Sequence, residues 1–390
     1  MSATADVVVV GAGIMGCTTA FELSRRGVDV LVLEKTGIGS GGTGLSSAII
    51  RTHYSHEITT RMALYSLRVF KHFDEAVGGD CQFHRTGWVA LAPETDRASL
   101  ATNVAMHQRL GIAARLLAVE EVREVLPAAY LEDVVAASWE EESGYADPHL
   151  TVTAYADAAR RHGARFQLGT AVSGIRFAGD RVAGVRTPAG DIDAQVVVNC
   201  AGPWGGRVAA MAGLTIPVAS PRIQVAVFRR PGDETEHPVV MDFVQGIYLR
   251  AEVGGLTLVG RIDPAEAEEI VDPDDFATHV DEPFVEYVAE RTLHRCRGWE
   301  NVEYASGYAS LYAVTPDWHP IIDEVPAGSG HFLCTGFSGH GYKLGPAVGL
   351  MMAELITRAS PMTLDPSLFR LARFAEQGLV HSKYAHSITG

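Results

Sequence analysis

Three glycines near the N-terminus have the spacing of a phosphate-binding turn. Gly11, Gly13 and Gly16 follow Val7–Val10, an apolar run typical of a buried parallel strand, and a helical pattern then continues to Arg26. Because glycine has no side chain, a dinucleotide pyrophosphate can approach the backbone N–H groups at such a helix start. The sequence therefore predicts a dinucleotide site with contacts from Gly11, Gly13, Ile14, Met15 and Gly16.

An acidic residue, Glu34, follows the second expected strand, Val28–Leu33. It is placed to accept hydrogen bonds from adenosine ribose hydroxyls, and its charge disfavours the 2′-phosphate of NADP. This motif leaves NAD and FAD open. A second match to the glycine pattern, Gly37–Gly42, precedes no amphipathic helix, so we interpret it as a flexible loop. Further contacts are expected from Lys35, Ser46, Ser47 and Val172.

Two later turns help to choose between the two cofactors. Val196–Trp204 has the pattern of a buried strand that runs into a Gly-Pro turn, and Gly336–Lys343 is a glycine-rich turn before a helix. A long cofactor could use both turns, whereas a simple NAD domain would leave the second unexplained. The sequence therefore favours FAD, with contacts expected from Ala201, Gly202, Trp204, Gly339, His340, Gly341 and Lys343.

The elements that position these residues are interleaved along the chain. Helices are expected at His56–Val77, Asp96–Leu110, His149–His162, Asp281–His294 and Gly345–Thr357, and antiparallel strands in Arg222–Gly260. This order predicts an α/β protein with a Rossmann-like FAD-binding domain and a second α+β substrate domain containing an antiparallel sheet, both discontinuous in sequence. We place the FAD-binding domain at 1–85, 147–218 and 316–390, and the substrate domain at 86–146 and 219–315.

Composition narrows the class of protein. The 390 residues carry a formal net charge of −15 without a cluster of Lys or Arg, which argues against nucleic acid or an anionic membrane as a partner. The longest apolar runs have the length of strands, and no export signal is visible, so we expect a cytoplasmic protein. Five scattered cysteines suggest reduced thiols. His53 and His56 are three residues apart, but without further ligands we assign no metal.

Several motifs, taken in order, resemble the D-amino-acid-oxidase/sarcosine-oxidase superfamily. They are the N-terminal glycine motif, Ser47–Arg51, Asn199–Trp204, Thr315–Asp323 and Gly336–Gly341, and they span nearly the whole chain. The chain looks most similar to sarcosine oxidases, their β subunits and dimethylglycine dehydrogenase-like proteins. This resemblance implies a FAD domain and a substrate domain whose antiparallel sheet covers the flavin.

The resemblance also implies roles for individual residues. Residues matching Arg51 and Lys343 bind the substrate carboxylate in sarcosine oxidases, and a residue matching Tyr312 is an active-site tyrosine. Tyr248 is expected on the strand that covers the substrate, and His340 is a further candidate. The turn Gly339–Lys343 is expected to lie along the flavin, where the start of a helix stabilises negative charge. Tyr54 and His53 are weaker candidates, since packing explains them equally well.

Two departures from the family pattern affect the expected chemistry. Ser310 stands where monomeric sarcosine oxidases attach their flavin to a cysteine, so FAD is expected to be noncovalent. Those oxidases also carry a lysine that promotes the reaction with oxygen, in the stretch matching Gly255–Leu258. Here Thr257 takes that place, so either oxygen or another electron acceptor is possible.

The expected function is oxidation of the C–N bond of a small carboxylated amine, with hydride transfer to flavin N5. The amine is expected to be N-methylated or otherwise secondary or tertiary, and the resulting imine or iminium can hydrolyse. A first alternative is a FAD-dependent 2-hydroxy acid dehydrogenase, with His340 as the base. A second is a flavin-bearing β subunit that works with partner subunits in an electron-transfer complex.

Overall fold

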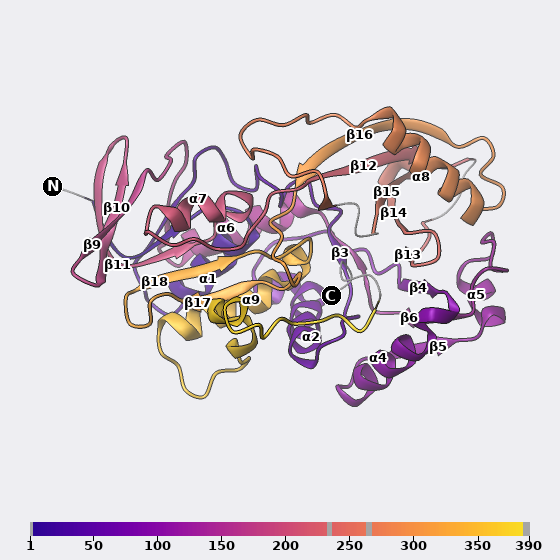
Figure 1. Cartoon of the computed structure of the whole chain (residues 1–390), viewed down its shortest axis with the longest axis horizontal. Coiled ribbons are helices and arrows are strands. Elements are labelled where there is room, and N and C mark those ends of the chain that lie inside the picture. The colour runs from indigo at the N-terminus through magenta and orange to yellow at the C-terminus, as the bar shows by residue number, and fades with distance from the viewer. Residues whose placement is uncertain (1–2, 232–235, 263–266, 385–390) are drawn as a thin grey trace.

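Two eight-stranded sheets, one in each half of an elongated molecule, organise the computed structural model, which describes residues 3–231, 236–262 and 267–384 (Figure 1). The first sheet has the order β17-β18-β11-β1-β2-β8, with β9 and β10 extending it beside β11. Its strands are β1 (Ala3–Val10), β2 (Val30–Leu33), β8 (Arg165–Gln167), β9 (Gly174–Ala178), β10 (Arg181–Thr187), β11 (Gly190–Asn199), β17 (Ile321–Glu324) and β18 (His331–Thr335).

The centre of the first sheet is parallel, because β1 pairs in parallel with β2 and β11, β2 with β8, and β11 with β18. Strands β9, β10 and β17 are antiparallel to their neighbours. The helices of this half are α1 (Ile14–Ser24), α2 (Glu57–Lys71), α3 (Phe73–Ala76), α6 (Pro148–Arg161), α7 (Gly205–Ala210) and α9 (Gly341–Ile356). Helix α1 packs against α6 and α9. The close approach of α1 and α9 requires Gly349, where an added Cβ would lie 2.7 Å from Thr18.

The second sheet has the order β16-β12-β15-β14-β13-β4-β6-β5. Its strands are β4 (Trp88–Ala92), β5 (Ala114–Leu117), β6 (Ala136–Glu140), β12 (Arg222–Arg229), β13 (Val239–Asp242), β14 (Ile247–Glu252), β15 (Leu256–Arg261) and β16 (Glu303–Leu311). All neighbours pair antiparallel except β4 and β13, which are parallel. Helices α4 (Arg97–Arg109), α5 (Val119–Val125) and α8 (Glu282–Arg295) belong to this half, and the short pair β3 (Ile49–Ile50) and β7 (Gly144–Tyr145) lies between the two sheets (Figure 1).

The expected fold class is confirmed: a mainly parallel sheet with helices is joined to a largely antiparallel second sheet, and the segments of the two alternate along the chain. The predicted domain limits stay a prediction, and their outer ends at residues 1 and 390 lie outside the described residues. Helix α9 was expected to begin at Gly345 but begins at Gly341. The turn before it is completed by positive φ angles at Gly336 and Gly339, so Lys343 already lies in the first helical turn.

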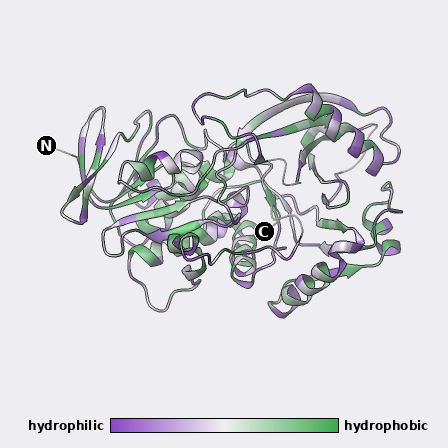
Figure 2. Cartoon of the chain, in the orientation of Figure 1, coloured by the Kyte–Doolittle hydropathy of each residue, from purple (hydrophilic) through white to green (hydrophobic). Residues whose placement is uncertain are grey.

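Hydrophobic residues concentrate along the strands of the first sheet and in helices α1 and α9, whereas hydrophilic residues are frequent along α4 and α8 (Figure 2). Every residue of α1 is buried. No helix in the described part of the chain is long and apolar enough to cross a membrane.

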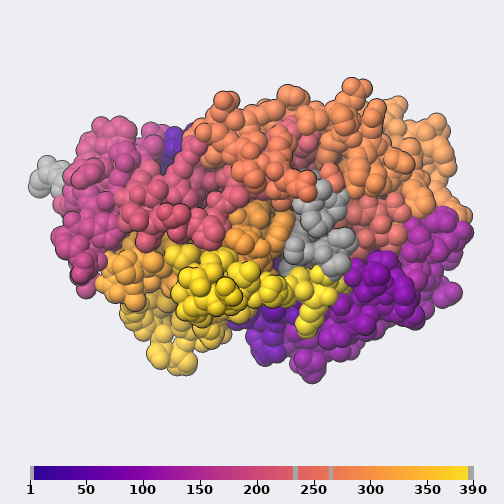
Figure 3. All heavy atoms as spheres, viewed as in Figure 1, coloured from indigo at the N-terminus to yellow at the C-terminus, as the bar shows by residue number. Residues whose placement is uncertain are grey.

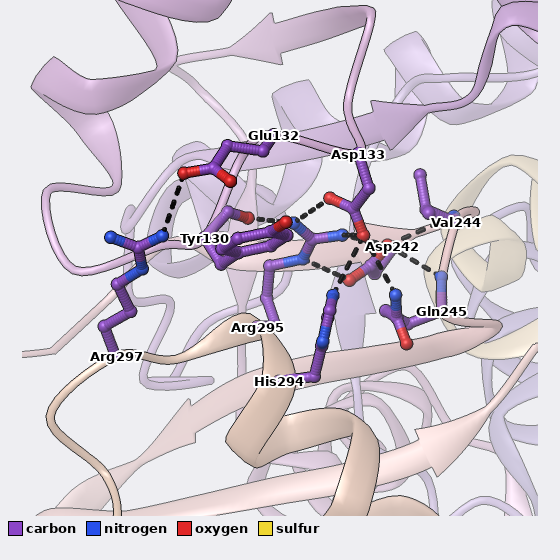
Figure 4. A network of polar contacts seen from close by, with 9 residues as sticks. All are labelled: Tyr130, Glu132, Asp133, Asp242, Val244, Gln245, His294, Arg295 and Arg297. Carbon is purple, nitrogen blue, oxygen red and sulfur yellow. Dashed lines mark hydrogen bonds and ion pairs between the residues drawn. The ribbon is translucent and has the colours of Figure 1, made fainter.

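A buried ion-pair network ties helix α8 to the second sheet (Figure 4). The Arg295 guanidinium lies 2.6 Å from an Asp242 carboxylate oxygen at the end of β13 and 2.8 Å from Asp133. Arg295 is 1% exposed and Asp242 is fully buried. Asp242 also accepts hydrogen bonds from the backbone N–H groups of Val244 and Gln245. These donors are uncharged, so Arg295 supplies the positive charge that balances the buried carboxylate.

Replacing Arg295 should destabilise this half strongly. Arg295→Leu leaves the Asp242 carboxylate buried without its cation, which costs about 3–5 kcal/mol of unfolding free energy. Arg297→Leu is the matched control, because its ion pair with Glu132 is exposed and contributes about 1 kcal/mol or less. Urea unfolding of both variants measures the difference, and equal destabilisation would show that the buried network does not hold α8 in place.

Candidate active site

A cavity of about 640 Å³ is lined by residues from both halves of the molecule. From the first sheet it receives the carboxyl ends of parallel strands, including Val10, Leu33 and Cys334. From the second sheet it receives Met241 and Tyr248, among others. The carboxyl ends of parallel strands are where open α/β sheets bind ligands, so this cavity is the candidate active site.

One end of the cavity has the bare backbone that a dinucleotide requires. Gly11 has a φ of +106°, and a Cβ there would lie 2.6 Å from the Cys200 carbonyl oxygen. Gly13 caps helix α1, whose first-turn Ile14 N–H donates to Thr43 Oγ1 at 3.0 Å. Gly16 does not line the cavity. Its missing side chain instead makes room for the Gly11 carbonyl, which a Cβ would approach to 1.9 Å.

The Glu34 carboxylate is held at the edge of this end. One oxygen accepts the Ala12 N–H at 2.9 Å, and the other accepts the Thr36 N–H at 2.8 Å. Beside it, Lys35 forms an ion pair with Asp274 at 2.5 Å and lies 3.7 Å above the Trp204 ring. The bare glycine backbone, the helix start and the fixed acid fit the adenosine and pyrophosphate of FAD, which these residues would hold.

Two basic side chains, Arg51 and Lys343, also line the cavity. Arg51 is buried just after β3, donates to the His53 carbonyl oxygen and stacks 4.4 Å from the Tyr54 ring centroid. Lys343 is buried in the first turn of α9, and it makes no ion pair with any residue that the structure describes. Burial, together with the charge of Arg51, lowers the pKa of Lys343 well below its ordinary value.

The neighbouring polar groups are held neutral. His340 Nδ1 lies 3.4 Å from the Tyr54 hydroxyl. Burial, reinforced by the charges of Lys343 and Arg51, lowers the pKa of His340 well below its ordinary value. Burial also raises the pKa of Tyr54 to about 12. At neutral pH neither group is a strong base, because the imidazole binds a proton weakly and the phenol keeps its own.

Two tyrosine rings are fixed against glycine backbone. A Cβ on Gly260 would lie 2.5 Å from the Tyr248 ring, and a Cβ on Gly339 would lie 2.6 Å from the Tyr312 ring. Tyr248 pairs with Gly260 across β14 and β15, so the second sheet sets its position. Both tyrosines line the cavity, and their rings can shape a substrate pocket.

The Thr315–Asp323 motif lies outside the cavity lining and supports the turn before α9. Ser338 has a φ of +49°, and its hydroxyl lies 3.2 Å from the Thr315 N–H, which donates to it. The Asp317 carboxylate is fully buried and forms an ion pair with Arg373 at 2.8 Å, and Arg373 also donates to the His319 carbonyl oxygen. These bonds hold the strained turn in place.

The cavity brings together every predicted site residue except Gly16. The lining contains, from the prediction, Gly11, Gly13, Ile14, Met15, Glu34, Lys35, Ser46, Ser47, Arg51, Val172, Ala201, Gly202, Trp204, Tyr248, Tyr312, Gly339, His340, Gly341 and Lys343. The weaker candidates His53 and Tyr54 do not line it, and Tyr54 instead supports Arg51 from behind. The roles of these residues stay a prediction.

Sequence reasoning missed several polar residues of the lining, among them Thr43 and Arg261. Thr43 directly follows the Gly37–Gly42 stretch that was interpreted only as a loop, so the second glycine motif was its signal. Arg261 ends β15, one residue beyond the expected strands, and packs 4.4 Å from the Tyr287 ring. Thr257 lies outside the lining, and its hydroxyl is 3.0 Å from His237 Nε2.

Gly16→Ala should weaken FAD binding by about tenfold or more, because the new Cβ pushes α1 off the Gly11 carbonyl and such overpacking costs about 1–3 kcal/mol. Gly37→Ala is the control, since nothing lies within 4 Å of a Cβ there and its φ is not positive. Titration of each apoprotein with FAD, followed by flavin fluorescence, gives the two affinities. Equal affinities would mean that the α1–β1 packing is not needed for the cofactor.

Comparison with known proteins agrees with the geometry. Human sarcosine dehydrogenase is 28% identical over 93% of this chain, although the matched region covers only 40% of that longer protein. Sarcosine oxidase subunit beta of Rhodobacter capsulatus is 25% identical over 98% of this chain and 92% of its own length. The crystal structure of L-proline dehydrogenase from P. horikoshii superposes with a TM-score of 0.89 at 30% identity, covering 98% of this chain and all of that one.

Residues 6–355 match the family described as FAD dependent oxidoreductase (DAO). That span contains all of the cavity lining and both sheets apart from the first three residues of β1. The chain therefore belongs to the DAO family of FAD dependent oxidoreductases, and FAD is its cofactor.

Proposed function

We propose that this protein oxidises the C–N bond of a small amino acid whose nitrogen is a secondary or tertiary amine. The observation that carries the proposal is that two buried basic side chains, Arg51 and Lys343, line the same cavity, close enough for the charge of Arg51 to lower the pKa of Lys343. Burial and the charge of Arg51 lower the pKa of Lys343 well below its ordinary value. An anionic group between the two side chains would offset this unfavourable arrangement. A substrate carboxylate supplies that charge, and Arg51 can bind it through two parallel hydrogen bonds.

The same cations favour a neutral amine on the substrate. Among the described residues that line the cavity, only Glu34 and Asp274 are acidic, and both lie near the dinucleotide end beside Lys35. None of the described lining residues offers a carboxylate near Arg51 and Lys343 to hold an ammonium group, so binding lowers the pKa of the substrate nitrogen. The neutral nitrogen keeps the lone pair that stabilises the developing iminium.

Bound FAD would supply the acceptor for the hydride that leaves the carbon next to nitrogen. The protein contributes orientation, since Arg51 and Lys343 hold the carboxylate. Tyr248 on β14 and Tyr312, which directly follows β16 and packs against Gly339, restrict the substrate. The first turn of α9 directs backbone N–H groups towards the cavity, where they favour negative charge. Loss of the hydride gives an imine or iminium, which water can hydrolyse to a carbonyl compound.

A 2-hydroxy acid substrate would need a base for its hydroxyl proton. The lowered pKa of His340 and the raised pKa of Tyr54 make both poor bases. An uncharged amine needs no such base. The names of the relatives support the same choice, because sarcosine and proline are both amino acids with a secondary nitrogen.

The acceptor that reoxidises the flavin belongs to the proposal as well. The lining lysines are Lys35 and Lys343, and neither lies on the second sheet. Ser310 lines the cavity at the position where monomeric sarcosine oxidases attach their flavin to a cysteine. Serine cannot form that thioether, which supports noncovalent FAD. We therefore expect slow reaction with oxygen and electron transfer to another acceptor. A relative that is a β subunit makes a partner subunit a reasonable candidate for that acceptor.

Arg51→Ala tests the proposed function. With an N-methyl amino acid as substrate, KM should rise about 10- to 150-fold, because a lost charge-assisted hydrogen-bonded pair costs about 1.5–3 kcal/mol. The assay follows reduction of an artificial acceptor dye and identifies the carbonyl product by mass spectrometry.

The FAD content of the variant should stay at one per chain, and Arg61→Ala, in an exposed pair with Glu57, is the control. An unchanged KM for the carboxylated amine, or a product that retains its C–N bond intact and unoxidised, would contradict the proposal.

Carboxylate binding should take up a proton at Lys343. The pKa of Lys343 is lowered in the free site, and a bound carboxylate raises it, so binding takes up a proton at any pH between the two values. The affinity is full below the lowered pKa and falls as the pH rises through that window. Calorimetry with propionate, in two buffers of different ionisation enthalpy, counts the protons.

Lys343→Met is the control variant and should bind propionate more weakly, without proton uptake. If the native holoprotein binds propionate with no proton uptake at any pH from 6 to 10, Lys343 does not change its charge on binding.

A further inference from the structure

A buried cluster of metal-ligating side chains lies directly behind Arg51, outside the cavity lining. His53 follows β3, His107 belongs to α4, and Glu140 ends β6; their side chains are 1%, 0% and 2% exposed. One nitrogen or oxygen of each lies within 4.8 Å of the others. The cluster therefore joins the Arg51 segment to a helix and a strand of the second half (Figure 1).

The hydrogen bonds around the cluster orient each side chain. His107 Nε2 lies 2.9 Å from the Tyr54 carbonyl oxygen, and His53 Nε2 lies 2.5 Å from the Tyr384 hydroxyl. One Glu140 oxygen accepts the Thr52 N–H at 2.8 Å. The Ser143 hydroxyl donates to the same Glu140 oxygen at 2.7 Å. Metal-binding histidines commonly donate their second ring N–H to such oxygen acceptors.

These bonds leave three buried atoms without a hydrogen-bond partner among the described residues: His53 Nδ1, His107 Nδ1 and Glu140 Oε1. When each ring carries its hydrogen on Nε2, the Nδ1 atoms of His53 and His107 both present lone pairs. Oε1 of Glu140 is likewise an acceptor. Three acceptors cannot satisfy one another. A single water molecule has two hydrogens and satisfies at most two of them, whereas a cation is coordinated by all three.

We propose that His53, His107 and Glu140 bind a divalent first-row transition metal, through the two Nδ1 atoms and Oε1. Two imidazoles and one carboxylate are a ligand set that zinc and its neighbours accept. Bonds of about 2.0–2.1 Å in a tetrahedral site place ligand atoms about 3.3 Å apart. One ligand atom of each residue already lies within 4.8 Å of the others. Modest rotations of the three side chains would bring these atoms to that spacing.

The metal would position the substrate-binding segment rather than take part in the reaction. None of its three ligands lines the cavity. The His53 carbonyl oxygen accepts the hydrogen bond from Arg51, and the Tyr54 ring stacks under the guanidinium. A bound ion fixes His53 directly and Tyr54 through His107. His56, three residues after His53, does not belong to the cluster, since its Nε2 lies 2.8 Å from the His381 carbonyl oxygen.

The C-terminal segment covers this region. It runs across the surface from the first half towards the second, beside the residues of β4–α5 (Figure 3). Ser99 in α4 donates to the Lys383 carbonyl oxygen at 2.8 Å, and the Tyr384 ring stacks on His53 at 5.7 Å. A chelator therefore has restricted access to the cluster, and metal exchange should be slow.

The test uses the untagged, full-length holoprotein. After prolonged dialysis against a chelator and then against metal-free buffer, it is titrated with zinc chloride by calorimetry, and bound metal is counted by plasma mass spectrometry. Native protein should bind one zinc per chain. His107→Gln should weaken binding by about 100-fold or more. His72→Gln, which changes an exposed histidine at the end of α2, should bind like the native protein.

X-ray absorption at the zinc edge of the native protein gives a result that does not depend on any variant. The expected spectrum has nitrogen and oxygen ligands, two of them imidazoles, and no sulfur. Native protein that takes up less than one tenth of an equivalent of zinc, a spectrum with sulfur or with fewer than two imidazoles, or equal affinities of His107→Gln and His72→Gln would each overturn the proposal.

Discussion

The burial of two basic side chains, Arg51 and Lys343, in one cavity is the constraint on which the rest of the site depends. The His53 carbonyl oxygen accepts a hydrogen bond from Arg51, and the Tyr54 ring stacks on its guanidinium, whereas burial and the nearby Arg51 lower the pKa of Lys343. The start of α9 adds a further positive dipole beside Lys343. An anionic ligand would be stabilised by all of these groups, so the proposed selectivity for carboxylates would follow from electrostatics more than from shape.

The two halves of the molecule divide the remaining tasks. The first sheet and α1 offer bare backbone to the cofactor, and the close contact of Gly16 with Gly11 sets that geometry. The second sheet offers Tyr248 from β14, whose ring needs the empty space above Gly260. The Asp317–Arg373 pair holds the turn before α9. Distant residues thus act on the substrate only by fixing the few groups that touch it.

Much of this arrangement could be predicted from the sequence, because the glycine motif, Glu34 and the Gly336–Lys343 turn are local patterns with a physical reason. What could not be predicted depends on contacts between distant segments. The parallel pairing of β4 with β13 has no local signal, and neither does the meeting of His53, His107 and Glu140. Arg261 was missed because it lies one residue beyond the expected strands, and the second sheet, not its neighbours in sequence, places it at the cavity.

Anaerobic reduction of the bound flavin is the most direct measurement of the proposed C–N oxidation. Purified holoprotein is mixed, without oxygen, with sarcosine, N,N-dimethylglycine, proline and glycine, and separately with glycolate and lactate, while the flavin absorbance is followed. The proposed function predicts rapid bleaching by at least one secondary or tertiary amine and none by the hydroxy acids. Bleaching by glycolate or lactate, with no response to any amine, would contradict it.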